Sequence, residues 1–237
     1  ELPRDALKPV LSLLANELKT LPPWIKIVAT SRDDSWTQVV SEVANIRRMT
    51  LDLTDETSCS TFASQVNHPI QCVVNCSGLL HDAGIQPERT WRHLDPKQMA
   101  EVFAVNSIAV AMAVKHLLPL IGRQERGVFA SLSARVGSIS DNRLGGWYSY
   151  RASKAAQHMI LKCAAIEASR LYPNLTCVAL HPGTVDTALS QPFTSRTPAE
   201  RLFTPEKSAG HLLDVLAALG PTDSGGVFAW DGTSIEY

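Results

Sequence analysis

The stretch GVFASLSARVGSISDNRLGGWYSYRASKAAQHMILKCAAIEASRLYPNLTCVAL, residues 127–180, decides the fold. It begins with the strand-like run GVFASLS (127–133) and ends with a second apolar run, LTCVAL (175–180). The helical pattern between them begins near Tyr148, and Pro173 closes it because the residue before a proline avoids the helical conformation. Two strands joined by a helix run parallel in a sheet that helices cover.

The same alternation continues on both sides of this stretch. Further strand-like runs lie at residues 25–30 (IKIVAT), 47–51 (RRMTL) and 70–77 (IQCVVNCS). Asp95 followed by Pro96 predicts the start of a long helix that extends to residue 120, and Thr204 with Pro205 predicts another, since Asp and Thr cap helices and proline fits their first turn. We therefore predict one α/β domain over residues 1–237, with a parallel sheet between two helix layers.

Composition excludes several kinds of partner. The formal net charge is −1 and no long basic block occurs, so we expect no nucleic-acid or anionic-membrane binding. No apolar run approaches the roughly 18 residues of a membrane span, and ELPRDALKPV (1–10) lacks the layout of a signal peptide. We expect a soluble protein of the cytoplasm.

The five cysteines predict reduced thiols. Their number is odd, and Cys72, Cys76 and Cys177 lie in apolar runs, where we expect them to be buried. No second Cys or His pair accompanies Cys72 and Cys76 at ligand spacing, so we predict no metal site.

Polar residues and glycines follow the strand-like runs, at the sheet edge where parallel sheets bind ligands. On the helix that begins near Tyr148, Tyr150 and Lys154 stand four positions apart and therefore share one face. A phenol and an ammonium one turn apart can act on the same small molecule. An ordinary surface pair is the alternative interpretation, which the surrounding motifs disfavour.

These motifs together resemble the short-chain dehydrogenase/reductase family, from about residue 24 to the C-terminus. YSYRASK resembles the YxxxK signature of the family, with Tyr150 as the catalytic tyrosine and Lys154 as its lysine. Asn106 in FAVNSIAV is similar to the asparagine that bends the long helix and anchors a proton-relay water. VVNCSG resembles the NNAG-type turn, with Asn75 and Gly78 in the matching places.

The resemblance also implies a dinucleotide site on a Rossmann-like, doubly wound, three-layer α/β/α sheet, with residues 1–237 forming one dinucleotide-binding and catalytic domain. LDLTD is similar to the segment in which Asp52 and Leu53 would meet the adenine ring. HPGTVDT is similar to the loop that holds the nicotinamide carboxamide. In that loop the implied residues are Pro182, Gly183 and Val185, with Thr187 near the pyrophosphate.

The implied chemistry explains the pairing of Tyr150 with Lys154. A phenol with a pKa of about 10 is a poor acid at neutral pH, and a neighbouring cation lowers that pKa. Tyr150 would then protonate the oxygen of a carbonyl substrate, or accept the proton of an alcohol in the reverse direction. Lys154 would also bind the ribose hydroxyls of the cofactor.

The end of the second strand of the family fold decides the cofactor. An acidic residue there favours NAD, whereas this sequence has Ser31 followed by Arg32, whose planar guanidinium suits a phosphate. We therefore expect NADP(H). Because Asp33 and Asp34 come next and weaken the electrostatic argument, NAD(H) stays the alternative.

The sequence departs from the family pattern at the active-site serine. Counted back three residues from Gly137, that position holds Ala134. The neighbouring Ser133 and Ser138 carry hydroxyls that a small shift of the turn would bring to the site, and we favour Ser133.

A second departure is the absence of the first strand and of the glycine-rich GxxxGxG turn from the sequence as given. DALKPVLSLLANELKT (5–20), with leucines at helical spacing, matches the later part of the helix that follows that turn. Without the first strand, the sheet would lack its central member between the runs at 25–30 and 70–77. Buried backbone groups left unpaired there would cost about 1 to 3 kcal/mol each.

The motifs favour an NADP(H)-dependent oxidoreductase that reduces a carbonyl or oxidises an alcohol on a small, apolar substrate. The alternative is a catalytically impaired relative that acts as an interaction or regulatory module, which the absent glycine turn and Ala134 favour. The segment DTALSQPFTSRTPAERLF (186–203) would form a lid over the substrate. Phe193, Leu202, Phe203 and Trp147 indicate an apolar wall, and ordinary packing is the alternative interpretation. The resemblance also implies a homodimer or homotetramer.

Overall fold

The computed structural model of the protein describes residues 26–32, 46–195 and 197–237. Strands and helices alternate along these residues, as the sequence predicts. The strands are β1 (Ile27–Ser31), β2 (Ile46–Thr50), β3 (Cys72–Asn75), β4 (Gly127–Leu132), β5 (Leu175–His181), β6 (Thr184–Val185), β7 (Leu202–Phe203) and β8 (Val227–Ala229). The α-helices are α2 (Glu56–Ser64), α3 (Pro96–Phe103), α4 (Ala109–Leu117), α5 (Tyr148–Ala168) and α6 (Pro205–Ala218).

The main sheet has the order β3-β4-β5-β8, and all of its strands are parallel. Strands β1 and β2 form a separate parallel pair. Within the described residues no ladder joins β1 to β3, and the predicted absence of the central strand stays a prediction. Val28 on β1 and Val74 on β3 are 39% and 44% exposed, although valine usually faces the interior.

The burial predicted for three of the cysteines is only partly confirmed. Cys177 on β5 is buried, as predicted, but Cys72 on β3 is exposed and Cys76 is only half-buried. In the part of the chain that the structure describes, β3 pairs on one side only, with β4. All five thiols are free.

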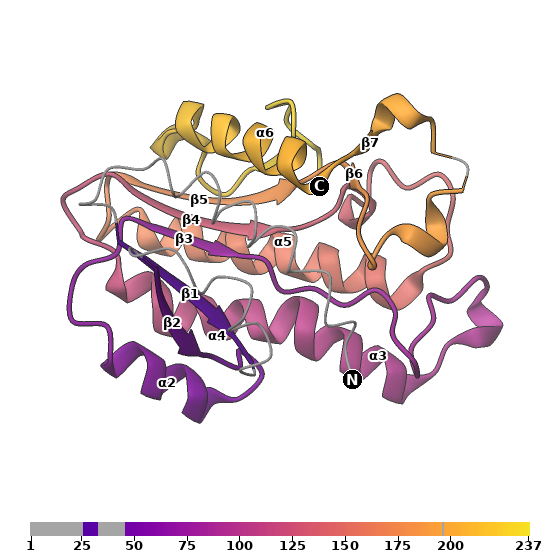
Figure 1. Ribbon diagram of the computed structural model, residues 1–237, viewed down its shortest axis with the longest axis horizontal. Coiled ribbons are helices and arrows are strands. Elements are labelled where there is room, and N and C mark those ends of the chain that lie inside the picture. Colours follow the sequence, from indigo (N-terminus) through magenta and orange to yellow (C-terminus); the bar gives the residue numbers. More distant parts are fainter. Residues whose placement is uncertain (1–25, 33–45, 196) are drawn as a thin grey trace.

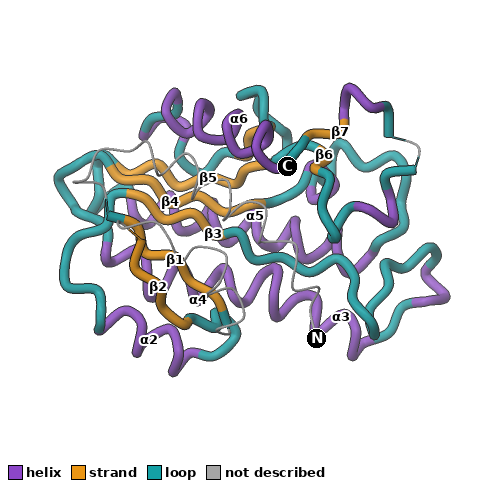
Figure 2. Tube along the Cα trace, in the orientation of Figure 1, coloured by secondary structure: helices purple, strands orange, loops and turns teal. Residues whose placement is uncertain are grey.

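Helices lie on both faces of the main sheet, so the fold is the predicted three-layer arrangement (Figures 1 and 2). Alternate residues of each strand point to opposite faces, and each face has its own apolar core. Phe129 and Cys177 belong to the core under α4 and α5, whereas Val128 and Val178 belong to the core under α6. This alternation explains why β4 and β5 carry apolar residues on both faces.

The long helix predicted after Asp95 is interrupted by a wider turn. Asp95 caps α3 by accepting a hydrogen bond from the backbone N–H of Gln98, and a π-helical segment over Ala104–Ile108 separates α3 from α4. The helical run Pro96–Leu120 is long and apolar enough to span a bilayer, which corrects the expectation that no stretch is. Here Val110 and Ala113 of the run are buried in the core beneath the sheet.

Other boundaries differ from the expectations in detail. The α5 helix ends at Ala168, before the predicted stop at Pro173, and a turn follows it. Thr204 caps α6 as expected by accepting from Lys207 N. The sequence patterns did not predict α2 or β8. The predicted helix at residues 5–20 and the pair Asp33 and Asp34 lie outside the described residues.

Candidate active site

Tyr150 and Lys154 lie on the buried face of α5, one helical turn apart. Their relative exposures are 8% and 3%. The Lys154 ammonium lies 5.8 Å from the centre of the Tyr150 ring. It donates hydrogen bonds to the Leu132 carbonyl at 3.0 Å and to Gln157 Oε1 at 2.9 Å. The pair is therefore held at the carboxyl end of β4, and a surface-pair interpretation does not fit this burial.

Burial governs the titration of both groups. It raises the pKa of Tyr150 to about 12 and lowers the pKa of Lys154 to about 7. The expectation was that Lys154 and a bound nicotinamide cation together lower the pKa of Tyr150; in the protein alone, burial shifts this pKa in the opposite direction. Desolvation disfavours the phenolate, and the ammonium is bonded to carbonyl oxygens rather than to the phenol.

The π-helical segment turns Asn106 toward the loop that follows β3. Asn106 Oδ1 accepts from Leu79 N at 2.7 Å, and Asn106 Nδ2 donates to Leu79 O at 2.8 Å and to Ser153 Oγ at 3.1 Å. A Cβ added to Gly78 would lie 3.7 Å from both Asn106 Oδ1 and Lys154 Nζ. The structure thus brings Asn106, Gly78, Lys154 and, through α5, Tyr150 to one place.

Asn75 ends β3 and connects this place to β4. Its Oδ1 accepts from the backbone N–H of Ser77 at 3.1 Å and from Ser77 Oγ at 2.8 Å. Its Nδ2 donates to Ser131 Oγ at 3.0 Å, and Gln157 Nε2 donates to the same oxygen at 2.8 Å. The sequence placed Ser131 among the polar residues at this edge of the sheet without giving it a role. It did not identify Gln157, which belongs to no motif that was considered.

The two candidate serines, Ser133 and Ser138, are both buried, and the hydroxyl of each lies within hydrogen-bond distance of a nearby protein group. Ser133 Oγ lies 2.7 Å from His158 Nε2 of α5. Ser138 Oγ accepts from Asp141 N at 3.2 Å and lies 3.3 Å from Ser140 Oγ. Neither hydroxyl forms a hydrogen bond with Tyr150 within the described residues, so the assignment of Ser133 or Ser138 stays a prediction.

The residues predicted to bind the adenosine end lie where β1 and β2 finish. Ser31 is half-buried and Arg32 is exposed directly after it. Asp52 Oδ1 accepts from the backbone N–H of Thr54 at 2.8 Å and from Thr54 Oγ1 at 2.6 Å, which closes a turn after β2. Leu53 is half-buried and packs against the core.

The loop after β5 holds the remaining predicted cofactor residues, and all of them are half-buried: Pro182, Gly183, Val185 and Thr187. Gly183 has a φ of 79°, and a Cβ there would come within 2.7 Å of the Phe203 ring. Only glycine satisfies both constraints, so the loop depends on it. Ser208 Oγ donates to Pro182 O at 2.8 Å and fixes the loop to α6.

Aromatic side chains surround one side of Tyr150. The Trp147 ring meets the Tyr150 ring edge to face, with 6.2 Å between centres, and meets Phe193 at 4.9 Å. Phe193 in turn contacts His81 at 5.5 Å. His81 Nε2 lies 3.0 Å from the Leu189 carbonyl and so connects to the segment predicted to be a lid. In the described part of the chain, ring contacts connect Tyr150 through Trp147 and Phe193 to His81, and we refer to Trp147, Phe193 and His81 as the aromatic wall.

Trp147 lies in a left-handed turn that the buried residue Glu88 stabilises. Trp147 has a φ of 51°, directly after two glycines with positive φ, and its N–H donates to the Glu88 carbonyl at 2.5 Å. The Glu88 carboxylate is 2% exposed and accepts from Ser149 N at 3.1 Å and from Gln98 Nε2 at 3.2 Å, as well as from Ser149 Oγ. Sequence reasoning missed this residue.

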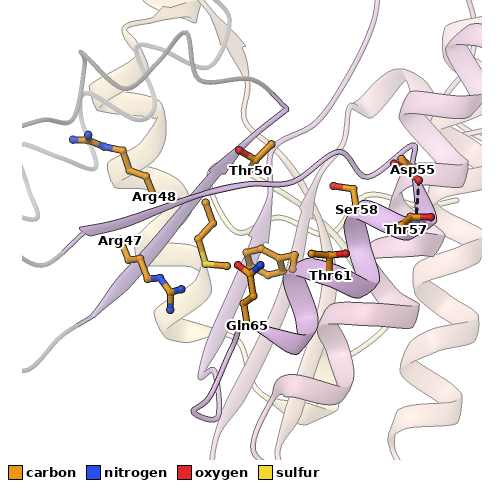
Figure 3. A pocket seen from close by; sticks show the side chains of 10 residues that line it. Arg47, Arg48, Thr50, Asp55, Thr57, Ser58, Thr61 and Gln65 are labelled. Carbon is orange, nitrogen blue, oxygen red and sulfur yellow. Dashed lines mark hydrogen bonds between the residues drawn. The ribbon is translucent and has the colours of Figure 1, made fainter.

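A cavity of about 500 Å³ lies elsewhere, between β2 and α2 (Figure 3). Arg47, Arg48 and Thr50 line it from β2, and Thr61 and Gln65 from α2. It contains none of the predicted site residues, and its polar, open lining lacks a catalytic group of the kind described above. We therefore place the candidate active site at the carboxyl ends of β3 to β5.

Comparison with known proteins agrees with this geometry. The sequence model of the family described as short chain dehydrogenase matches residues 22–198. The C-signal protein of Myxococcus xanthus is 31% identical over 170 residues, which is 68% of this chain and 95% of that protein. The 1-hydroxy-2-glutathionyl-2-methyl-3-butene dehydrogenase of Rhodococcus sp. (strain AD45) is 29% identical over 188 residues, 79% of this chain and 78% of that protein.

Solved structures give the same fold. The NADPH-bound carbonyl reductase from chicken fatty liver superposes with a TM-score of 0.81 at 25% identity, covering 98% of this chain and 96% of that chain. The carbonyl reductase Sniffer of D. melanogaster also has a TM-score of 0.81, at 21% identity, covering 96% of this chain and 94% of that chain. The overall fold is therefore shared with these proteins.

Proposed function

Because the chain belongs to the short chain dehydrogenase family and is an oxidoreductase of the carbonyl reductase type, we propose that it reduces a carbonyl, or oxidises an alcohol, on a small apolar substrate with NADP(H). The observation that carries this proposal is the buried pair of Tyr150 and Lys154 at the carboxyl edge of the sheet, beside Gly78 and Asn106. A proton donor and a cation are held there next to a glycine turn that leaves room for a ligand.

The residues present fit a dinucleotide at this edge. An ammonium has three N–H donors, and the hydrogen bonds of Lys154 use two of them, on Leu132 O and Gln157 Oε1. One donor remains for a ribose hydroxyl. The bound cofactor would supply or accept the hydride. Tyr150 would give its hydroxyl proton to the substrate oxygen, and the positive charge of Lys154 would stabilise the phenolate left behind.

Arg32 supports NADP(H) over NAD(H). It is exposed at the carboxyl end of β1, directly after Ser31, so that a serine and not an acidic residue ends this strand. A guanidinium binds a phosphate through two parallel hydrogen bonds, whereas a carboxylate at this place would repel it. The NADPH-bound chicken carbonyl reductase, at 25% identity, adds to this argument.

The aromatic wall supports an apolar substrate. Trp147, Phe193 and His81 connect the lid segment to Tyr150, and a planar or apolar group would pack against these rings without an unpaired polar atom. Aldehydes, ketones and quinones are therefore the compounds with which to begin.

The proposal is tested by measuring NADPH and NADH oxidation with a panel of such carbonyl compounds. We expect activity with NADPH, a higher KM for NADH, and a loss of at least about a hundredfold in kcat/KM in Tyr150→Phe, because only the proton donor is removed. Tyr148→Phe is the matched control. Tyr148 is half-buried, lies two residues before Tyr150 on the same helix, and is assigned no role.

Full activity in Tyr150→Phe would refute the proposed chemistry. A preference for NADH would remove Arg32 from its role. If NADPH neither supports turnover nor quenches the fluorescence of the five tryptophans, the chain is the non-catalytic interaction module that was the alternative.

Assembly is a further part of the proposal. Met159 and Ile166 on α5 are exposed, and so is Ile108, the residue directly before α4. We propose that a second copy covers this face in a homodimer, or in a homotetramer built from it. The five free thiols support a reducing compartment such as the cytoplasm.

A further inference from the structure

Gln157 is a polar side chain with no exposed surface, on α5 three residues after Lys154. Its Nε2 donates to Ser131 Oγ at 2.8 Å and to the Leu132 carbonyl at 3.0 Å. Its Oε1 accepts from Lys154 Nζ at 2.9 Å. A buried amide is destabilising unless it is hydrogen-bonded, and here both ends of the amide have partners.

The partners of the amide fix its orientation. Leu132 O can only accept a hydrogen bond, so the NH₂ group must face it, and the carbonyl oxygen is then turned to the ammonium. Ser131 also accepts from Asn75 Nδ2 at 3.0 Å, which connects the amide to the end of β3. Gln157 is thereby anchored to two strands of the sheet and presents one oxygen to Lys154.

The Lys154 ammonium has no carboxylate partner among the described residues. Its two acceptors are neutral oxygens, Leu132 O and Gln157 Oε1. The titratable groups that face it are Tyr150 and His158, both on α5. Asn75 and Ser131 at the strand ends, and Asn106 of the π-helical segment, are uncharged. Neutral acceptors alone therefore stabilise the positive charge.

We infer that Gln157 is a positioning residue for Lys154, whose amide oxygen holds the ammonium beside Tyr150 and extends the pH range in which it stays charged. This inference rests on the proposed function. Gln157 acts through Lys154, because its hydrogen bonds go to Lys154, Ser131 and Leu132 and none reaches Tyr150.

The expected effect has a definite sign. Burial lowers the pKa of Lys154 to about 7, and each acceptor oxygen opposes that shift by stabilising the charged form. Removing the amide oxygen would therefore lower the pKa of Lys154 further. A carboxylate in its place would raise it, because an opposite charge at hydrogen-bond distance favours the ammonium.

The first experiment is the pH dependence of kcat/KM for carbonyl reduction with NADPH. In Gln157→Met, which keeps the volume and removes the acceptor, we expect the alkaline limb to move about one pH unit lower. In Gln157→Glu we expect it to move higher by a similar amount. The control is Val178→Ala, which opens a cavity at a fully buried position of β5 and should leave the limb in place.

The second experiment does not need activity. Between pH 7 and pH 10.5 the unfolded chain binds more protons at Lys154 than the folded chain does, so stability rises with pH over this window. Urea unfolding across this range should show the rise beginning at lower pH in Gln157→Met and at higher pH in Gln157→Glu. A merely structural residue would lower stability equally at every pH.

Shifts of opposite sign in the two variants are the expected result. An unmoved limb and an unmoved stability profile in either variant, or shifts of the same sign in both, would overturn the inference, as would failure of both variants to fold. If the parent protein lacks a Tyr150-dependent reductase activity, the proposed function fails, while the unfolding profiles still decide the role of Gln157.

Discussion

His158 is a buried histidine whose surroundings lower its pKa. It is 2% exposed on α5, with Nε2 against Ser133 Oγ and with Nδ1 lacking a hydrogen-bond partner within the described residues. Burial, and to a smaller extent the charge of Lys154, lower the pKa of His158 to about 4. The ring is therefore neutral at pH 7 and adds no second positive charge beside the active-site cation.

The depressed pKa of His158 predicts acid sensitivity. Below its ordinary pKa of 6.5 the unfolded chain takes up a proton that the folded chain refuses until about pH 4. The His158 contribution to stability is thus constant above pH 6.5, and it falls by about 3 kcal/mol between pH 6.5 and 4. His158→Gln should remove most of that fall in urea unfolding measured across this range. His93→Gln, at an exposed site, should not, and equal slopes in both variants would contradict the argument.

Among the helices and strands, the sequence predicts those that have turn or capping residues at their ends and a regular pattern of apolar residues. Strands β4 and β5 are short apolar runs with turn residues beside them, and α6 begins at a Thr-Pro signal, so each was predicted within a few residues. Helix α2 was missed although Asp55 caps it, because its apolar residues are few, with only Cys59 and Phe62 buried. Its helical pattern is weak, and tertiary packing decides its structure.

The residues of the candidate site also fall into two groups, those that the sequence identified and those that it missed. Tyr150, Lys154 and Asn106 were identified because they lie in recognisable motifs. Gln157 was missed because a glutamine on a helix is normally assigned to the solvent face. Glu88 was missed because its partner Ser149 is 61 residues away along the chain. Such contacts follow from the packing of separate elements, and no local pattern contains them.

Glu88 determines where α5 begins. Its buried carboxylate accepts from the backbone N–H of Ser149 in the first turn of the helix, where the helix dipole favours a negative charge. Glu88→Gln should cost about 2 kcal/mol in urea unfolding, because an amide NH₂ would then face the donors of Ser149 or Gln98. Glu101→Gln, at an exposed position of α3, is the control and should change stability by less than about 0.5 kcal/mol.

In Glu88→Gln, enzyme activity should change as well as stability. The turn that Glu88 holds also aims Trp147 at Tyr150 and Phe193. We therefore expect KM for the carbonyl substrate to rise in Glu88→Gln, with a smaller change in kcat. If kinetics are unchanged although the protein is less stable, the turn does not position the aromatic wall.

Across the whole molecule, the described strands form three separate sheets: β1-β2, the larger β3-β4-β5-β8, and the short pair β6-β7. The predicted catalytic residues Asn106, Tyr150 and Lys154 lie on helical segments packed on the β3-β4-β5-β8 sheet. The predicted adenosine-binding residues Ser31, Arg32, Asp52 and Leu53 lie at the ends of β1 and β2. The two ends of a bound dinucleotide would therefore contact separate sheets. Cofactor binding would join them and should stabilise β1 and β2 more than the main sheet.

The exposed apolar face of α4 and α5 gives the last prediction. Met159 and Ile166 on α5 are 64% and 55% exposed, and Ile108 beside α4 is 54% exposed. In a homodimer that covers this face, Met159→Lys would bury an ammonium without a partner and weaken association by about a hundredfold or more. Light scattering after size exclusion should then give a dimer or tetramer for the parent and a monomer of 25.8 kDa for the variant. Leu144→Lys, at a leucine that is 90% exposed in the loop before α5, should assemble like the parent, and a monomeric parent would contradict the proposed assembly.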